Sequence, residues 1–584
     1  MKIVNLAKFN AATTILLFGL GTSSLVMAQD APHQGRPLDW SHSQVVASKG
    51  GPDGGASIYN DWRTIFRHIQ KNQAKMERAA MSGATMGSSA PRSGRAKDKP
   101  GGKSAGLMLD WSLRTGSNGT VTGYPAKYSF DITASNCNDV IYFTVDQAGS
   151  ASAVNVIAIT NPYALCPGNL LGTTPTVKFG IAMTNGTATS AVPSLDGTVL
   201  YVMENAAAGM VLHAINVNNI TVNPGTYSFI TNTWLTTHTL AAPTGLPGSE
   251  QLFQIAITGA TNNRSSPYLD YSGNQIFVGD AAGAIHRIQN THLATASEDT
   301  TNFPVACGAA EQRSPVFVNG QVITASAAPG TLYRIDTTAA TPYTCIASAA
   351  LGNGAGGELA SPVIDSSNNK IIVTTTHASS GVARSLMLMQ LFFTAGATPI
   401  SSAGLGPIVG GLRPRIPALD DAFYNTNNGN LYADGGPTTG SNAYLVRVSY
   451  DCTVSCTFGG PAGYAALHHT GGGSNAAASP VAIFTTASAL ANPEFVYVGG
   501  STGNYLYMNR IASGFGGTDA APVAIDAANS STGFFAVPGG ADSGIIVDNR
   551  SSGVTGSTAT ANIYFGTVGA GATQSTVVQL AQQF

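Results

Sequence analysis

The strongest pattern in the chain is a short antiparallel meander that recurs from about residue 107 onward. Its clearest copy begins with an apolar run over 265–270 and a turn at Ser272-Gly273-Asn274. A second apolar run covers 275–280, and after a turn at Gly283 a third, alternating run covers 284–288. Such runs, separated by tight Gly and Asn turns, are typical of antiparallel strands. We therefore expect this region to be all-β.

Eight copies of this pattern follow one another. The equivalent positions used to phase them are residues 128, 193, 267, 315, 362, 421, 480 and 544. Their spacings, 47 to 74 residues, fit propeller blades of about 40 to 50 residues with inserted loops. A single meander cannot bury both of its faces, whereas meanders arranged radially each pack against two neighbours. The sequence predicts a single β-propeller of about eight four-stranded blades over 107–584, with seven as the alternative count.

Closure of such a ring needs contact between its two ends. The last copy, which ends near Leu580, lacks an outer strand. The apolar segment 107–113 lies at the other end of the repeat region and can supply that strand. We predict that these two segments pair.

The repeat grammar is Ser-Pro-x-x-Asp followed by apolar-x-Val-Gly-Asp, as in 266–270 and 276–280. It resembles the PQQ-like family of eight-bladed propellers, which includes quinoprotein dehydrogenases and an outer-membrane assembly scaffold. The resemblance covers about 107–584 and implies the fold. The adjacent cysteines and tryptophan-bearing blade motif of the dehydrogenases are missing, so no cofactor residue is carried over and no cofactor is predicted. The scaffold is a lipoprotein, whereas no cysteine here precedes Cys137.

The first 28 residues have the features of a secretory signal peptide. Lys2 and Lys8 precede an apolar stretch, and Val26-Met27-Ala28 forms a small-residue cleavage site. We expect cleavage after Ala28 and a secreted protein, either periplasmic or extracellular. Later windows do not approach the roughly 20 apolar residues of a membrane span, so we expect no transmembrane segment.

Three zones separate the signal peptide from the repeats. Residues 29–57 are rich in Gly, Ser and Pro and predict a flexible leader, and 83–106 predict a disordered linker. Between them, 58–82 predict one amphipathic basic helix. Its apolar residues are Trp62, Ile65, Phe66 and Ile69, with Asp61 as N-cap. Such a helix either packs on the propeller as a spacer or docks on a partner or an anionic surface.

Six cysteines predict three disulfides in an oxidising compartment. They are Cys137, Cys166, Cys307, Cys345, Cys452 and Cys456. Six cysteines permit 15 connectivities. Proximity in sequence favours Cys137 with Cys166, Cys307 with Cys345, and Cys452 with Cys456. The haem-attachment pattern C-x-x-C-H is absent.

The charge of the chain is low and uneven. Charged residues make up 10% of 584 residues, against about 25% in typical soluble domains. Residues 1–103 hold 14 Lys and Arg against 6 Asp and Glu, whereas 104–584 hold 14 against 24. An acidic body of this kind lacks the clustered cations that phosphate contacts need. We therefore expect no nucleic-acid partner.

Few residues are candidates for chemistry. His468-His469 could form a metal or catalytic pair, but adjacent residues on a strand point to opposite faces. Several carboxylates next to predicted turns either bond their own turn or bind structural calcium. These are Asp196, Asp270, Asp280, Asp365, Asp420 and Asp421. Sequence-local enzyme signatures such as G-x-S-x-G and H-E-x-x-H are absent, so no catalytic, cofactor-binding or metal residue is assigned.

Two classes of function stay open. The first is a non-enzymatic exported propeller that acts as a binding or scaffold module for a protein, a glycan or a cell-surface assembly. The low charge, the Gly-rich loops, the disulfides and the missing catalytic signatures favour it. The alternative is an oxidoreductase, lyase or hydrolase whose residues are dispersed around the central channel.

Overall fold

The computed structural model describes residues 35–51 and 106–583. Within the second range it leaves out 117, 132–135, 164–165, 167–174, 207–208, 245, 247, 261–263, 328, 353–356, 377–382, 408–413, 436–443, 467–481, 486–493, 501–504, 512–522, 525–531, 537–542, 549–558 and 569–573. The predicted signal peptide, the helix at 58–82, the linker up to residue 105 and His468-His469 lie outside the described residues.

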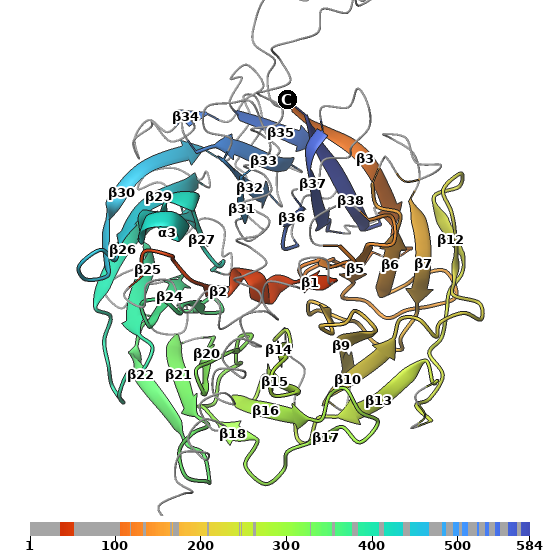
Figure 1. Cartoon of the computed structure of the whole chain (residues 1–584), viewed down its shortest axis with the longest axis horizontal. Coiled ribbons are helices and arrows are strands. Elements are labelled where there is room, and N and C mark those ends of the chain that lie inside the picture. The colour runs from red at the N-terminus through yellow and green to blue at the C-terminus, as the bar shows by residue number, and fades with distance from the viewer. Residues whose placement is uncertain are drawn as a thin grey trace, which may run out of the picture.

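Eight sheets of four or five strands surround a common axis in this described part of the chain (Figure 1). We number them sheet 1 to sheet 8 in chain order. Sheet 1 holds β4 (Ala126–Ser129), β5 (Val140–Thr144), β6 (Val156–Thr160) and β7 (Thr176–Ile181). Sheet 2 holds β8 (Val192–Pro193), β9 (Val199–Ala206), β10 (Gly209–Asn216) and β13 (Gln251–Ala256). Sheet 3 holds β14 (Tyr268–Asp270), β15 (Gln275–Gly279), β16 (Ala284–Gln289), β17 (Ser297–Glu298) and β18 (Val305–Ala306). Sheet 4 holds β19 (Val316–Val318), β20 (Gln321–Ala325), β21 (Thr331–Asp336) and β22 (Cys345–Ala350).

The remaining sheets continue around the axis. Sheet 5 holds β23 (Val363–Asp365), β24 (Lys370–Thr375), β25 (Ala383–Gln390) and β26 (Ser401–Pro407). Sheet 6 holds β27 (Ala418–Leu419), β28 (Asn428–Gly435), β29 (Tyr444–Asp451), β30 (Thr457–Ala466) and β34 (Val523–Ala524), with α3 (Asp421–Thr426) after β27. Sheet 7 holds β31 (Ala482–Thr485), β32 (Glu494–Gly500), β33 (Tyr505–Arg510) and β35 (Thr532–Ala536). Sheet 8 holds β36 (Ile546–Asp548), β37 (Ala559–Gly566), β38 (Thr576–Gln583) and β3 (Gly106–Arg114).

The all-β propeller fold predicted from the repeats is confirmed. The three apolar runs of the clearest copy form β14, β15 and β16, joined as an antiparallel meander. Apolar side chains on facing sheets form a shared core, so that Leu212 of sheet 2, Ile276 of sheet 3 and Ile323 of sheet 4 belong to one buried cluster. Each sheet thus buries its two faces against its neighbours. The eight sheets favour a count of eight blades, which stays a prediction.

The ring closes as the sequence predicts. β3 pairs antiparallel with β38, with Leu109 opposite Leu580 and Leu113 opposite Val577. Sheets 1 and 8 are also joined by the fully buried Lys127, whose Nζ lies 3.1 Å from Asp139 Oδ2 and 2.5 Å from Asp548 Oδ2. Strand pairing and a buried charge network therefore connect the two ends of the propeller.

The three predicted disulfides are confirmed. Their pairs are Cys137 with Cys166, Cys307 with Cys345 and Cys452 with Cys456. The first and third pairs lie within sheets 1 and 6 or their loops, whereas the second joins the end of β18 in sheet 3 to β22 in sheet 4.

A two-stranded ribbon projects from sheet 2. It consists of β11 (Thr226–Ser228) and β12 (Thr233–Thr236), inserted between β10 and β13. The indole Nε1 of Trp234 donates to the carbonyl of Arg114 at 3.0 Å, and the hydroxyl of Tyr227 accepts from the Arg114 amide at 2.9 Å. The ribbon thus reaches past sheet 1 to the end of the closing strand β3. It is an element that the repeat pattern does not predict.

Part of the predicted flexible leader is folded. Residues 35–51, which we call the channel strap, contain β1 (Arg36–Leu38), the 3₁₀ helix η1 (Trp40–Ser43) and β2 (Val45–Val46). For these residues the expectation of a flexible leader is wrong. Their apolar side chains are too few to give a periodic pattern, yet Trp40, Val45 and Val46 are all buried. In the described part of the chain, no helix is long and apolar enough to cross a membrane.

Candidate functional site

The channel strap crosses the centre of the ring (Figure 1). At one end β1 adds to sheet 1 by antiparallel pairing with β4, with Pro37 opposite Tyr128. At the other end β2 adds to sheet 5 by parallel pairing with β23, with Val45 opposite Ile364. The strap therefore connects two sheets that are four positions apart in the ring, and its backbone hydrogen bonds hold it across the axis.

Between these strands, η1 places an indole inside the channel. The side chain of Asp39 caps η1 by accepting from the Ser41 amide at 2.9 Å. Trp40 is 2% exposed, and its Nε1 donates to the carbonyl of Pro267 at 3.2 Å. Its ring meets the ring of Tyr268 edge-on, with centroids 6.2 Å apart. Trp40 thus anchors the middle of the strap to sheet 3.

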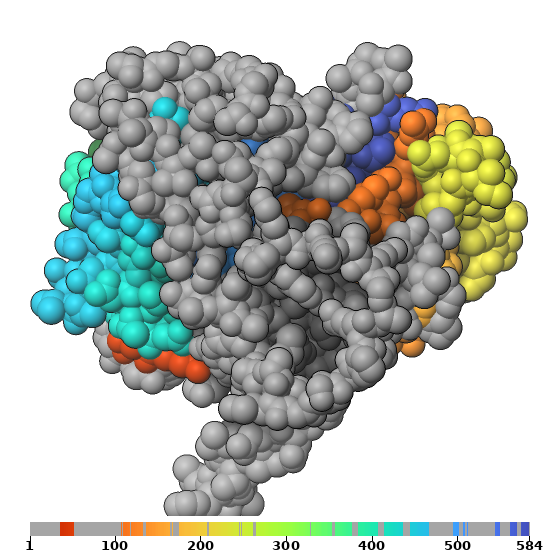
Figure 2. Space-filling model, turned by 90° about the horizontal axis from the view of Figure 1, so that it is seen from above, coloured from red at the N-terminus to blue at the C-terminus, as the bar shows by residue number. Residues whose placement is uncertain are grey.

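The far end of the strap reaches the surface. The Lys49 amide donates to the carbonyl of Tyr424 at 3.0 Å, which places Lys49 against α3 of sheet 6. Lys49 and Gly50 are exposed, and Figure 2 shows part of the strap, in red, on the outside of the molecule. The strap therefore contacts sheets 1, 3, 5 and 6.

A cavity of about 180 Å³ remains in the channel beside the strap. Trp40 and Gln44 of the strap form part of its wall, and sheets 1 to 6 or the loops that lead into them supply the rest. The cations on this wall are Arg264, Arg313 and Arg415, and no Asp or Glu of the described residues lines it. Arg264 is exposed, Arg415 is half-buried and Arg313 is buried.

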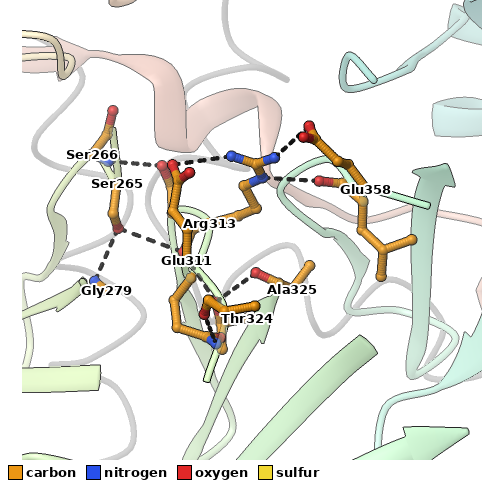
Figure 3. Close-up of polar contacts among 12 residues, drawn as sticks. Ser265, Ser266, Gly279, Glu311, Arg313, Thr324, Ala325 and Glu358 are labelled. Carbon is orange, nitrogen blue, oxygen red and sulfur yellow. Dashed lines mark hydrogen bonds and ion pairs between the residues drawn. The ribbon is translucent and has the colours of Figure 1, made fainter. Parts of the chain in front are cut away.

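Arg313 is the most constrained of these cations. Its guanidinium lies between Glu311 and Glu358, at 3.1 Å and 2.8 Å, and its Nε donates to the carbonyl of Leu359 at 3.1 Å. Figure 3 shows this arrangement, with the two carboxylates on opposite sides of the guanidinium. Two of these contacts come from the loop before β23, so Arg313 joins sheets 4 and 5. Its charge is therefore balanced by two glutamates.

Serine hydroxyls around the channel link successive sheets. The Tyr124 amide donates to Ser190 Oγ at 2.8 Å, the Ser190 amide to Ser266 Oγ at 2.9 Å, and the Ser266 amide to Ser314 Oγ at 2.8 Å. Ser266 and Ser314 are the serines of the Ser-Pro repeat motif. The residue before proline is held in an extended conformation. Its amide therefore does not take part in the hydrogen bonds between the strands of its own sheet. The motif is thus explained by contacts between sheets at the channel wall.

Two buried polar atoms at the cavity have no hydrogen-bond partner in the described structure. They are Oε1 of Gln44, a residue that is 1% exposed, and the hydroxyl oxygen of Tyr124. Burial raises the pKa of Tyr124 well above its usual value, and nearby Arg415 partly opposes that rise. The hydroxyl therefore stays protonated and can donate. Buried polar groups are usually paired, and these are two of several buried side-chain atoms in the described residues that lack a hydrogen-bond partner.

A larger groove of about 590 Å³ lies where the strap begins, between sheets 1, 2 and 3. Arg36, Tyr128, Asp196 and His292 contribute polar groups to it, and Leu252 is one of its apolar residues. Burial raises the pKa of Tyr128 to about 12, with a further contribution from the Asp196 charge. Burial also lowers the pKa of His292, although Asp196 opposes this. At neutral pH the groove therefore holds the anionic Asp196, the cationic Arg36 and the neutral imidazole of His292.

The predicted turn carboxylates lie in turns. Asp196, Asp270, Asp280, Asp365 and Asp420 each accept from a backbone amide two or three residues ahead. Asp421 follows the N-cap of α3, and its amide donates to Glu494 Oε1 at 2.6 Å. The turn interpretation is confirmed for the first five. Calcium binding stays a prediction.

One group of ligand-type side chains lies close enough for a metal ion among the described residues. Asp365, Cys452 and Cys456 place their ligand atoms within 4.8 Å of one another. The two sulfurs form a disulfide, so they do not offer thiolates. This group is therefore better explained as structural.

Sequence reasoning missed the histidines buried between the strands. His286 on β16 lies between Glu298, 2.8 Å from its Nδ1, and Asp280, 3.5 Å from its Nε2. Burial alone would lower the pKa of His286, but hydrogen bonds and charge from both carboxylates raise it. His213 on β10 has a similar contact, with Nε2 2.8 Å from Glu204. The sequence feature that could have identified them is a histidine within an otherwise apolar strand segment.

Comparison with known proteins assigns the chain to no family. No protein-family model matches the chain, and neither does any curated protein. Among solved structures, the computationally designed Ika8 protein aligns with 9% identity and a TM-score of 0.43, over 81% of this chain and 99% of that one. BamB from Moraxella catarrhalis aligns with 11% identity and a TM-score of 0.33, over 68% and 96%. The WD40 domain of coronin from Toxoplasma gondii aligns with 11% identity and a TM-score of 0.35, over 66% and 79%.

These values carry no argument about what this chain binds or catalyses. The resemblance to the PQQ-like family stays a prediction. Function must therefore be argued from the residues themselves.

Proposed function

We propose that this protein is an exported, non-enzymatic propeller that acts as a binding or scaffold module for a protein partner. The occupied central channel supports this most strongly. In a propeller, side chains from several blades converge on the channel, so a dispersed enzyme site would be built there. In this chain the strap crosses that space, and the cavity of about 180 Å³ beside it is too small for a polymer substrate. Large ligands are thus directed to the outer surfaces.

Export is supported by two independent features. The signal-peptide pattern of residues 1–28 predicts it. Three disulfides, with no free cysteine among the described residues, suit an oxidising compartment.

The insert that carries the ribbon β11–β12 is the surface that best suits a protein partner. Its large exposed side chains include Val222, Ile230 and Leu235, which are 68%, 98% and 60% exposed. Trp234 and Tyr227 hold the same ribbon against the propeller from its other side. The segment projects from the edge of the molecule in Figure 2, where it is yellow. Exposed apolar side chains concentrated on one element mark interaction sites.

The test uses partner capture from the exported fraction of the native host. The variant Val222→Ser/Ile230→Ser/Leu235→Ser removes exposed apolar atoms that contribute little to folding. The matched control is Val454→Ser, which is 97% exposed on sheet 6, between the cysteines of the third disulfide. Purified wild-type protein and both variants would be cross-linked in that fraction and analysed by mass spectrometry.

We expect wild type and Val454→Ser to capture the same protein at near-equal yield, and the triple variant to lose it. Equal capture by all three proteins would refute the ribbon as the docking surface. Absence of any specific cross-linked protein, together with conversion of a host polymer by the purified chain, would refute the binding-module proposal.

A further inference from the structure

The buried lysine between sheets 1 and 8 carries an inference that goes beyond partner binding. We propose that the side chains of Lys127 and Asp548 form an amide, an isopeptide bond, that closes the ring covalently, with Asp139 as the proton relay. This modification uses none of the ribbon residues and does not depend on the proposed function. It rests on the exclusion of water, on distances and on the number of protons.

The reacting groups are shielded from water. The side chains of Lys127, Asp139 and Asp548 are 0% exposed. Tyr163, which contacts both carboxyl groups, is 1% exposed. Lysine is almost never fully buried unless it is paired, and a buried ion pair is often no more stable than apolar residues of similar volume. A buried lysine with two carboxyl groups, where one would balance its charge, is therefore better explained by chemistry than by stability.

The distances place the amine next to a carboxyl carbon. Lys127 Nζ lies 2.5 Å from Asp548 Oδ2. Because a carboxyl C–O bond is about 1.2 Å long, the nitrogen lies within roughly 3.7 Å of the Asp548 Cγ. Reacting atoms held about 3–3.5 Å apart behave as if at very high concentration. Asp139 Oδ2 is 3.1 Å from the same nitrogen, so Asp548 is the nearer electrophile and Asp139 is placed to exchange protons.

The hydrogen bonds require a proton on one of the two carboxyl groups. The Tyr163 hydroxyl lies 2.5 Å from Asp139 Oδ2 and 2.9 Å from Asp548 Oδ2, yet it has one hydrogen to donate. Burial raises the pKa of Tyr163 well above its usual value, so the hydroxyl keeps its hydrogen. Burial also raises the pKa of Asp139, although Lys127 and Tyr163 oppose the rise. Asp139 therefore supplies the second hydrogen, and Tyr163 connects the two carboxyl groups as a proton path.

The reaction needs no co-reactant. Proton transfer from Lys127 to Asp548 turns the ion pair into a neutral amine and a neutral carboxylic acid, the forms that a buried site favours. The Nζ lone pair then attacks Cγ of Asp548, and the Cγ–Oδ2 bond breaks. Asp139 passes its proton through Tyr163 to the departing Oδ2 and takes a second proton from the nitrogen. The products are one amide and one water, so atoms and charge balance. Because the site excludes solvent, it protects the amide from hydrolysis.

The fold brings these groups together from the two ends of the propeller. Lys127 is on β4 of sheet 1, whereas Asp548 is the last residue of β36 in sheet 8. Asp139 lies two residues after Cys137, whose disulfide with Cys166 holds the loop before β5. The amide would join residues that are 421 positions apart in sequence. It would thus make permanent the closure that the pairing of β3 with β38 already provides.

The test is tryptic peptide mapping of the folded protein, purified from the exported fraction and then reduced and denatured. Trypsin does not cleave after an acylated lysine, so the amide leaves 115–178 joined to 511–550 as one branched peptide. Its mass is lower than the sum of the two by one water. We expect this peptide in most molecules. Lys178, whose Nζ lies 3.4 Å from Asn218 Oδ1 at a partly exposed position, is the internal control and should be cleaved completely.

Variants separate the reaction from the ion pair. Lys127→Arg keeps the charge but offers a guanidinium that is never deprotonated, so it should give no branched peptide. Asp139→Asn removes the proton relay, so the amide should form at least about tenfold more slowly in pulse-labelled protein. Tyr163→Phe interrupts the proton path and should also slow the reaction. The matched control Asp299→Asn alters the buried contact with Arg287 in sheet 3 and should react as wild type does. Circular dichroism would establish that each variant is folded.

Each contrary outcome refutes a defined step. Complete cleavage after Lys127 in the folded wild type would leave an ion pair only and overturn the proposal. Loss of water within 115–178, without 511–550 attached, would place the amide on Asp139 and exclude a link between sheets. Reaction at the wild-type rate in a folded Asp139→Asn would exclude the relay. If that variant does not fold, an unchanged rate in Tyr163→Phe would exclude the same proton path.

Discussion

Removal of the Trp40 side chain should detach the channel strap. Trp40 is 2% exposed, packs edge-on against Tyr268 and donates to the Pro267 carbonyl. Substitutions of buried tryptophan by alanine cost about 3–5 kcal/mol. That full amount appears in global unfolding only if strap and sheets unfold together. If the strap detaches first, the global loss is limited to the free energy that its docking contributes.

Two substitutions distinguish the contributions of the indole. Trp40→Ala removes the ring and its hydrogen bond, whereas Trp40→Phe keeps most of the apolar contact and leaves the Pro267 carbonyl without this donor, at a cost of about 1–2 kcal/mol. Val454→Ala, at a 97% exposed position, is the control. Unfolding in urea would be followed by circular dichroism, and cleavage sites within 35–51 would be mapped by mass spectrometry after brief proteolysis of the folded protein.

We expect Trp40→Ala to lower the unfolding midpoint and to become cleavable within the strap, and Trp40→Phe to show a smaller change of the same kind. The reasoning is refuted if Trp40→Ala keeps both the wild-type midpoint and the wild-type cleavage pattern. A lower midpoint without cleavage in the strap would show that strap and sheets form one cooperative unit.

Three further predictions concern the buried contacts. Lys127→Met leaves two buried carboxylates without their cation and should lower the free energy of unfolding by about 3–5 kcal/mol in urea titrations, whereas Lys178→Met at a partly exposed position should have little effect. Because the pKa of folded His286 is raised above 6.5, its contribution to stability is complete below about pH 6.5 and is lost as the pH rises through the raised value; His286→Gln should flatten this decline in unfolding midpoints measured between about pH 5 and 9. Gly180→Ala would place a Cβ 2.2 Å from the Trp234 ring, so it should displace the ribbon and shift tryptophan emission to longer wavelength; an unchanged spectrum would contradict the packing.

The repeat pattern was sufficient to predict the strands of the sheets because it combines two local rules. Apolar runs at a period of two and Gly or Asn turns act within ten residues, so β14 to β16 could be placed without knowledge of the rest of the fold. The disulfides followed from short separations of 29, 38 and 4 residues along the chain. The pairing of β3 with β38 could be predicted because the last repeat lacks an outer strand, whereas the apolar segment 107–113 belongs to no repeat.

The channel contacts were out of reach because they join residues far apart in sequence. The Trp40 indole meets a carbonyl 227 residues away, and the Ser48 amide meets a hydroxyl 319 residues away. The strap itself contributes a tryptophan and two valines among polar residues, which gives no periodicity. The role of the Ser-Pro serines was similarly hidden, since their partners lie one sheet further around the ring.

The strap changes what the segment 52–105 is able to do. Lys49 contacts α3, and residue 106 begins the closing strand of sheet 8, so the 54 residues from 52 to 105 are joined to the propeller at both ends. At about 3.5 Å per residue, a loop that must return reaches at most about 90 Å from its attachment points. A protease cut inside it would leave the strap held in the channel without a covalent link to the sheets. Anything that this loop recruits is therefore held within a fixed radius of the propeller face, at a high local concentration that does not depend on how dilute the protein is.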